Sequence, residues 1–505
     1  MATAKDRWEK LDGDREGVMS RARDCADVTI PALMPPMGSN ENSTLSQPYQ
    51  SLGARGVNNL SSKLTMTMLP SGSPFYRFQI GEDAAVTMDA QGKGQVEEGL
   101  RQLENRTSKG IESSNLRPVM SIANKLLIVT GNALLHVPDK GKSRTYNLTQ
   151  YVCVRDPMGT VIEGVIKESV HPSTLSDEIR AANQVQITDD SDESVDVYTH
   201  IRKVENKMEY HQEINDIKVP GSEGRNKIDE SPYIFLRWNA LDGEDYGRGH
   251  CEEYLGDLRS LEGLSKSIVT FAAAAAKIIF LEHPNAVTNS DELRAAESGE
   301  FVMGRREDID VLQLEKFADF QVAKSTLDDL TLRLSHAFLL TSGTVRNAER
   351  VTAEEIRLQA QELEDVLGGV YTVMAHELQQ PLVKRLMARA RKTGDFPALP
   401  AGAIDPVIVT GFDALGRGHE LNRYRQYFSD GVQLMGPEFM QGFSSDRVAQ
   451  LLATQHNVDI KDLKKTDEET QAEQQQAMAA TVMDKGTAPA VAAAGQMAVD
   501  NNRDS

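Results

Sequence analysis

The chain has few cysteines, few aromatic residues and a deficit of positive charge. Its three cysteines, Cys25, Cys153 and Cys251, stand far apart among 505 residues, with no Cys or His at metal-ligand spacing. Disulfide frameworks use even numbers of closely spaced cysteines, so we expect three free thiols in a reducing compartment. Lys and Arg total 55 against 75 Asp and Glu, a formal net charge of −20. That balance excludes a protein that grips nucleic acid through many basic contacts, although it allows DNA to slide past.

Long apolar runs are also missing. The longest, residues 267–281, contains Lys277 and falls short of the roughly 18–20 residues that a membrane span needs. We expect a packed helix there and no insertion into a membrane. The N-terminal segment MATAKDRWEKLDGDRE is charged and lacks the apolar region of a secretory signal. A hydrophobic content of 40% is ordinary for a chain that forms two to four domains.

The strongest pattern that is present is a helical one over residues 349–383. Thr352 and Glu355 have the spacing of a capping box, which satisfies free backbone N–H groups at a helix start. Apolar residues then recur every three or four positions, at Ile356, Ala360, Leu363, Leu367, Val370, Met374 and Leu378. This spacing predicts one very long helix with a buried stripe, roughly 60 Å long if it continues to about residue 391. Gly368, Gly369 and Pro381 are the predicted bend points.

The first half of the chain is predicted to place one antiparallel sheet among helices. We expect helices over residues 7–26, 53–69, 96–111 and 118–130, with a Pro-rich loop at 35–48. β-rich runs lie on both sides of the hairpin signal Asp156-Pro157-Met158-Gly159. Residues 195–204 and 208–219 form a second predicted strand pair, and residues 233–238 a further strand.

The second half is predicted to be mainly helical. Helices are expected over residues 252–281 and 320–338, separated by a mixed interval with a short helix near Asp291 and strands near Phe301 and Val311. A polar loop at 341–351 leads into the long helix. The β-like piece PVIVTGF then precedes a helical region that starts near His419. From about Thr466 the chain is rich in Gln and Ala, which predicts a frayed helix followed by disorder.

One short segment approximates a catalytic motif. Residues 376–380, His-Glu-Leu-Gln-Gln, approach the zinc-protease pattern H-E-x-x-H, but Gln380 replaces the second imidazole ligand. The favoured interpretation is therefore a polar helix face near a kink. A helix-rich cytoplasmic enzyme, metal dependent through His376 and Glu377, is the alternative hypothesis. We expect no enzyme activity and no cofactor or metal.

Several segments, in this order, resemble the portal or head-to-tail connector proteins of autographivirus-type short-tailed bacteriophages. The resemblance covers roughly residues 5–460, and the shared order of the motifs is more specific than any one of them. The segments are YQSLGARGVNNLSSKL at 49–64, VDVYTHI at 195–201, DGEDYGRGHCEEYLGDLRSLEGL at 242–264, GEFVMGRREDIDVLQLEKFADFQVAK at 299–324, ERVTAEEIR and ELEDVLGGVY in the long helix, and TGFDALGRGHEL at 410–421.

The resemblance implies an α+β, mostly helical portal fold, assembled as a ring of twelve copies around a central DNA channel. It implies the following regions: wing 1–251, first stem helix 252–281, clip 282–318, second stem helix 319–340, tunnel loop 341–351, long kinked wing helix and return strand 352–415, crown 416–465, and a low-complexity tail at 466–505. The implied function is that of the portal vertex in genome packaging, head assembly, tail attachment and DNA ejection.

The same resemblance implies the partners and the location. The partners are double-stranded DNA, the terminase motor, capsid and scaffolding proteins, and tail adaptor and internal core proteins. The protein is expected in the virion after assembly in the host cytoplasm. Five residues are expected nearest DNA. They are Lys324 and Arg333 on the second stem helix and Arg346, Asn347 and Arg350 at the loop, and all except Asn347 are basic. Salt bridges from one subunit to the next are the alternative role for these cations.

A compact mixed-charge patch in the expected clip is the other candidate site. It consists of Arg305, Arg306, Glu307 and Asp308, and it is suited to docking a partner. A solvated turn is the alternative interpretation.

Overall fold

The structure is a computed structural model in which the chain divides into two compact units, Met1–Leu415 and Gly416–Ser505. It describes residues 2–40, 42–70, 75–79, 114–186, 194–275, 279–312, 317–340, 369–392, 407–409 and 417–443, together with 96, 99–100, 102–104, 106–108, 110–111, 367 and 448. Within these residues, no helix is both long enough and apolar enough to cross a membrane.

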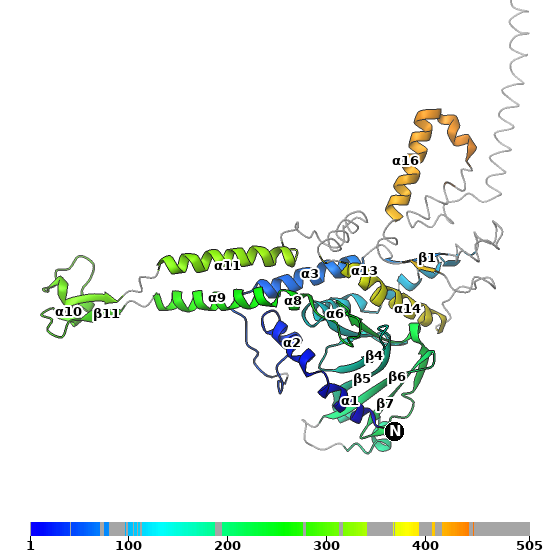
Figure 1. The fold of residues 1–505 in the computed structure, drawn as a ribbon, viewed down its shortest axis with the longest axis horizontal. Coiled ribbons are helices and arrows are strands. Elements are labelled where there is room, and N and C mark those ends of the chain that lie inside the picture. Colours follow the sequence, from blue (N-terminus) through cyan, green and yellow to red (C-terminus); the bar gives the residue numbers. More distant parts are fainter. Residues whose placement is uncertain are drawn as a thin grey trace, which may run out of the picture. The chain divides into compact units, whose positions relative to one another are not determined.

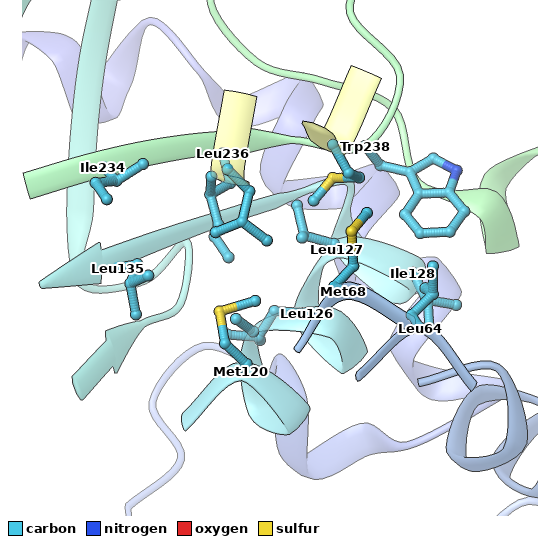
Figure 2. Close-up of a cluster of buried hydrophobic side chains, with 14 of the residues drawn as sticks. Leu64, Met68, Met120, Leu126, Leu127, Ile128, Leu135, Ile234, Leu236 and Trp238 are labelled. Carbon is cyan, nitrogen blue, oxygen red and sulfur yellow. The ribbon is translucent and has the colours of Figure 1, made fainter. Parts of the chain in front are cut away.

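The main core lies where two helices pack against a three-stranded sheet. The helices are α3 (Leu52–Met68) and α6 (Leu116–Thr130), and the antiparallel sheet has the order β10 (Tyr233–Arg237), β2 (Asn132–His136), β3 (Arg144–Tyr146). Figure 2 shows side chains of all these elements except β3 converging on one apolar cluster. Full burial of each large apolar side chain stabilises the fold by roughly 1.5–3 kcal/mol. The helices predicted at 53–69 and 118–130 are confirmed.

A larger antiparallel sheet carries the predicted hairpins. Its strands follow the order β4 (Tyr151–Arg155), β5 (Val161–Val170), β6 (Val195–Val204), β7 (Lys207–Ile214) and β8 (Ile217–Lys218), and β9 (Gly224–Lys227) also pairs with β7. The hairpin turn before β5 is confirmed. The prediction of a single sheet is wrong, because the strand at 233–238 pairs with β2, which the sequence analysis did not identify.

Side chains cover the free edge of β4. Arg15 donates to the carbonyl oxygen of Tyr151 over 2.6 Å, and the N–H groups of Cys153 and Arg155 donate to the Tyr246 hydroxyl and to Asp245. Exposed strand edges are templates for pairing with other chains, so these contacts close this edge to such pairing.

The N-terminal helical segment is two helices. α1 (Ala4–Gly13) has a capping box at Thr3 and Asp6, and α2 (Glu16–Asp27) begins after Arg15. Trp8 of α1 is buried against the larger sheet with Val152, Val165 and Tyr198. The described residues between 96 and 111 are helical, as predicted.

The long helix predicted from residue 349 is interrupted where the structure describes it. Gly369 has a φ of +94°, a left-handed conformation that breaks the α-helical hydrogen-bond ladder. α13 (Val370–Met374), a π-helical turn (Ala375–Gln379) and α14 (Gln380–Lys392) follow. The single continuous helix is therefore wrong at this point, whereas the bend predicted at Gly369 is confirmed. The π turn ends at Gln379, two residues before Pro381, which lacks the N–H that an α-helix would use. Residues 351–366 and Gly368 lie outside the described residues.

The buried stripe of that segment is confirmed as far as it can be followed. Leu367, Val370, Met374 and Leu378 are all buried in the main core. The β-like piece is also confirmed, because β13 (Val407–Val409) pairs antiparallel with β1 (Arg77–Gln79).

The second unit contributes α16 (Arg417–Met435) and a 3-10 helix (Pro437–Gly442). The rings of Tyr427 and Phe439 have centroids 5.7 Å apart. The helical region predicted near His419 is confirmed, and the tail predicted from Thr466 lies outside the described residues.

α14 is fixed by a buried arginine. Arg385 is 1% exposed and donates to the carbonyl oxygen of Val137 (2.8 Å), to that of Glu230 (3.3 Å) and to the Asp139 carboxylate (2.7 Å). One guanidinium therefore joins α14 to the segment after β2 and to the 3-10 helix Ile228–Glu230.

Burial lowers the pKa of two histidines in the main unit. His136 stacks on Tyr233 with ring centroids 4.6 Å apart, and burial lowers its pKa to about 4. No described residue hydrogen-bonds to its Nδ1. His250 lies among Trp238, Tyr254 and Phe338, and burial likewise lowers its pKa to about 4. Both rings are therefore neutral at pH 7.

We expect Arg385→Met to destabilise the main unit by about 1–3 kcal/mol, because it leaves the carbonyl groups of Val137 and Glu230 without this donor. The matched control is Lys384→Met on the same helix, whose partly exposed pair with Asp229 should contribute about 0–1 kcal/mol. Urea unfolding followed by circular dichroism measures both changes. Equal losses for the two variants would contradict the role assigned to Arg385.

Stability should fall as pH drops from about 6.5 to 4. In that window the unfolded chain binds protons at both histidines while the folded chain does not. Each histidine therefore lowers the free energy of unfolding by roughly 3 kcal/mol over this range. His136→Phe keeps a ring against Tyr233 and removes one titrating group. Its unfolding midpoint should therefore depend less on pH than that of the unaltered chain, and an unchanged slope between pH 7 and 4 would refute this assignment.

Candidate functional site

Two helices that run side by side form the frame of the candidate site (Figure 1). α9 (Leu255–Ala275) and α11 (Phe317–Ala337) pack through Leu258 and Leu261 of the first and Leu330 and Leu334 of the second. The rings of Phe271 and Phe320 lie 5.7 Å apart, at the opposite end of the pair from Asp257 and Arg333. The two helices are therefore antiparallel.

The helix pair exposes apolar side chains in a single copy of the chain. Val269 of α9 is 52% exposed, and Val322 and Leu332 of α11 are 67% and 56% exposed. Ala272, Ala273 and Ala274 are also exposed. Such faces on long helices are typical of surfaces that another protein surface covers.

The two basic candidates on α11 have different surroundings. Lys324 is exposed and forms no ion pair with another described residue. Arg333 is 64% exposed and reaches Asp257 of α9 over 3.7 Å. The alternative role of a salt bridge is thus present at Arg333, although within one chain.

A small two-stranded sheet connects the helices. β11 (Ile279–Glu282) pairs antiparallel with β12 (Ile309–Leu312), and α10 (Ser290–Ala295) lies between them in the chain. The helix predicted through residue 281 is wrong at its end, because the chain forms β11 there. The short helix near Asp291 and the strand near Val311 are confirmed. The strand near Phe301 is wrong, since Phe301 lies outside regular structure and is fully exposed.

Asp308 is a structural residue of this module. Its carboxylate accepts hydrogen bonds from the Thr288 hydroxyl (2.7 Å) and from the backbone N–H groups of Val287 and Thr288 (3.1 and 3.0 Å). The bond from the Thr288 hydroxyl, more than any other contact, lowers the pKa of Asp308 below its ordinary value. Asp308 therefore faces the interior of the module, and docking by the four-residue patch stays a prediction.

The other three residues of the patch remain at the surface. Arg305, Arg306 and Glu307 are exposed at the 3-10 helix Arg306–Asp308 and the residue before it. Phe301 and Met303, at 105% and 88% exposure, precede them in the chain. The exposed surface next to Asp308 is thus both charged and apolar.

The carboxyl end of α11 is anchored by side chains from two other elements. His250 of α8 (His250–Glu253) donates from Nε2 to the carbonyl oxygen of Ala337 over 3.0 Å. Asn59 of α3 donates to the carbonyl oxygens of Phe338 and Leu339, and Lys63 donates to that of Leu339 over 3.3 Å. Cations and donors are favourable at this negative end of a helix.

Sequence reasoning did not identify these anchoring residues. A signal was present for Lys63, which is a lone charge on the apolar face of the helix predicted at 53–69. Arg346, Asn347 and Arg350, in contrast, lie outside the described residues, so their predicted place near DNA stays a prediction.

His376 and Glu377 do not have the surroundings of a zinc site. Glu377 accepts from the backbone N–H of Arg237 (3.0 Å), and its other oxygen accepts from the guanidinium (2.7 Å). Gln379, also in the π turn, is buried and donates to the carbonyl oxygen of Met68. The π turn therefore holds α14 to β10 and α3, and the described residues include no group of His, Cys, Asp and Glu that could hold a metal ion.

Comparison with known proteins covers nearly the whole chain. The family model described as "Bacteriophage head to tail connecting protein" matches residues 1–463. The portal protein of Enterobacteria phage T3 is 40% identical over 510 residues, covering 99% of this chain and 95% of that protein. The portal protein of Escherichia phage T7 is 39% identical over 495 residues, covering 96% of this chain and 92% of that protein. The resemblance drawn from the motifs is confirmed, and the chain belongs to the bacteriophage head to tail connecting proteins, the portal proteins of the virion.

Proposed function

We propose that twelve copies of this chain form a ring at one vertex of the capsid, with a central channel through which duplex DNA is packaged and later ejected. The observation that carries this proposal is the family match over residues 1–463, together with curated relatives named portal protein. The helix pair supports it, because the exposed Val269, Val322 and Leu332 need a covering surface that neighbouring copies would supply.

The proposed regions follow from this arrangement. α9 and α11 are the stem helices, and the β11–β12 module is the clip, which would face the terminase motor and later the tail adaptor. Residues before α8 and those of α13 and α14 belong to the wing, and α16 belongs to the crown, toward internal core proteins. Capsid and scaffolding proteins would surround the ring, and assembly would take place in the host cytoplasm.

The proposed channel chemistry is one of weak contacts. Each firm basic contact with phosphate adds affinity that DNA movement must break again, so a chain with net charge −20 suits transport. Lys324, with no ion pair to another described residue, is the α11 cation we place nearest DNA. Arg333 would contribute only when its pair with Asp257 opens.

We expect purified protein to appear in electron micrographs as rings with a central hole. Leu332→Glu places a charge on the exposed face of α11 and should shift the population to smaller species with circular dichroism unchanged. Met158→Glu, at the 89% exposed hairpin turn before β5, is the matched control and should leave rings intact. A uniform monomer for the unaltered chain would overturn the ring itself, and intact Leu332→Glu rings would overturn this choice of interface.

Arg346→Glu should leave rings intact and reduce the yield of DNA-filled particles, because it reverses a charge in the proposed tunnel loop. Packaged DNA per particle, measured after infection complemented with the variant gene, tests this expectation. An unchanged yield would remove Arg346 from the set of DNA-facing residues.

A further inference from the structure

One part of the chain differs sharply in charge from the rest. Residues 42–81 contain neither Asp nor Glu, although 75 of the 505 residues are acidic. The basic residues in that range are Arg55, Lys63 and Arg77. The range includes all of α3.

α3 buries one side and exposes the other. Its buried side carries Leu52, Val57, Leu60, Leu64 and Met68. Arg55, Asn58 and Ser62 are exposed and recur at helical spacing, so they form one polar strip, which we call the α3 strip.

The polar groups of the α3 strip make few contacts with the described residues. No described residue forms an ion pair or hydrogen bond with the guanidinium of Arg55 or the side-chain amide of Asn58. Ser62 donates to the carbonyl oxygen of Asn58 over 2.8 Å, and its hydroxyl oxygen can still accept. The strip offers mainly donors and no carboxylate.

The helix that carries the strip, α3, lies beside the carboxyl end of α11 (Figure 1). A Cβ on Gly56 would lie 2.6 Å from Cγ of Phe338, so only glycine permits this approach of the two helices. Asn59, next to Asn58 in the chain, donates to the carbonyl oxygens of Phe338 and Leu339 over 3.0 Å each. The position of the strip relative to α11 is thus set by direct contacts.

We propose that the α3 strip, Arg55, Asn58 and Ser62, contacts the phosphate backbone of duplex DNA. This inference rests on the proposed function, since it places a second DNA-facing surface beside the end of α11. Arg, Asn and Ser side chains all donate to phosphate oxygens without reading base sequence. One cation per copy keeps each contact weak, which is what passage of any sequence requires.

Charge complementarity favours DNA over a second copy of the chain as the occupant. Phosphate is attracted to the guanidinium of Arg55, on a helix that itself carries no carboxylate, within a chain that is otherwise acidic. A copy-to-copy interface usually buries apolar side chains at its centre, and α3 has no large exposed apolar residue. The exposed apolar side chains that such an interface needs lie on α11 instead, at Val322 and Leu332.

The test compares Arg55→Gln and Arg55→Glu with Arg202→Glu, an exposed arginine on β6 that serves as the matched control for charge. Purified rings of each variant are titrated, at several salt concentrations, with a duplex of arbitrary sequence and about 30 base pairs. Ring formation is checked by electron microscopy and folding by circular dichroism.

We expect both Arg55 variants to form rings and to bind the duplex several-fold more weakly than the Arg202→Glu control. The slope of log affinity against log salt should become shallower by about 0.9 for each phosphate that the variant no longer neutralises. Arg55 variants that bind like the control while unaltered rings bind DNA would overturn this inference alone. Unaltered rings that bind no duplex would overturn the proposed channel as well, and loss of rings in Arg55→Gln would assign the α3 strip to a second copy.

Discussion

The placement of the paired helices depends on how the carboxyl end of α11 is held. Three donors, from His250, Asn59 and Lys63, satisfy the carbonyl groups of Ala337, Phe338 and Leu339, which an isolated helix would leave to water. Phe338 is fully buried against Gly56 of α3 and the ring of His250. Because α9 and α11 expose much of their own surface, this junction and the adjacent leucines connect the pair to the core of the main unit.

The same junction links the two surfaces that we assign to DNA. α11 carries Lys324 and Arg333, and α3 carries the α3 strip, while Phe338 and Leu339 contact α3 directly. A shift of one helix would therefore move the other. In a transport channel this arrangement would keep weakly basic groups at a constant spacing around the moving duplex, with no single group binding it strongly.

Buried polar contacts give the main unit its specific arrangement. Arg385 joins α14 to the segment after β2, and the Arg237–Glu377 pair joins the π turn to β10. Apolar packing alone would allow a helix to take several orientations about its own axis. A buried guanidinium with fixed acceptors allows only the orientation in which its hydrogen bonds form. The segment that makes these contacts is interrupted at Gly369 and contains the wide π turn before Pro381.

The sequence alone determined the local elements and the family. Helical and two-residue periodicities predicted α3, α6, the β4–β5 hairpin and the buried stripe through Leu378, because these depend on neighbouring residues. Ordered motifs along the chain indicated the portal family. Only the tertiary structure decided that Ile279–Glu282 is a strand, because its partner Ile309–Leu312 lies far along the chain and supplies the hydrogen bonds that end the helix. It also decided that Asp308 turns inward to Thr288 and that Lys63 caps α11, since charge alone does not reveal which backbone groups need a partner.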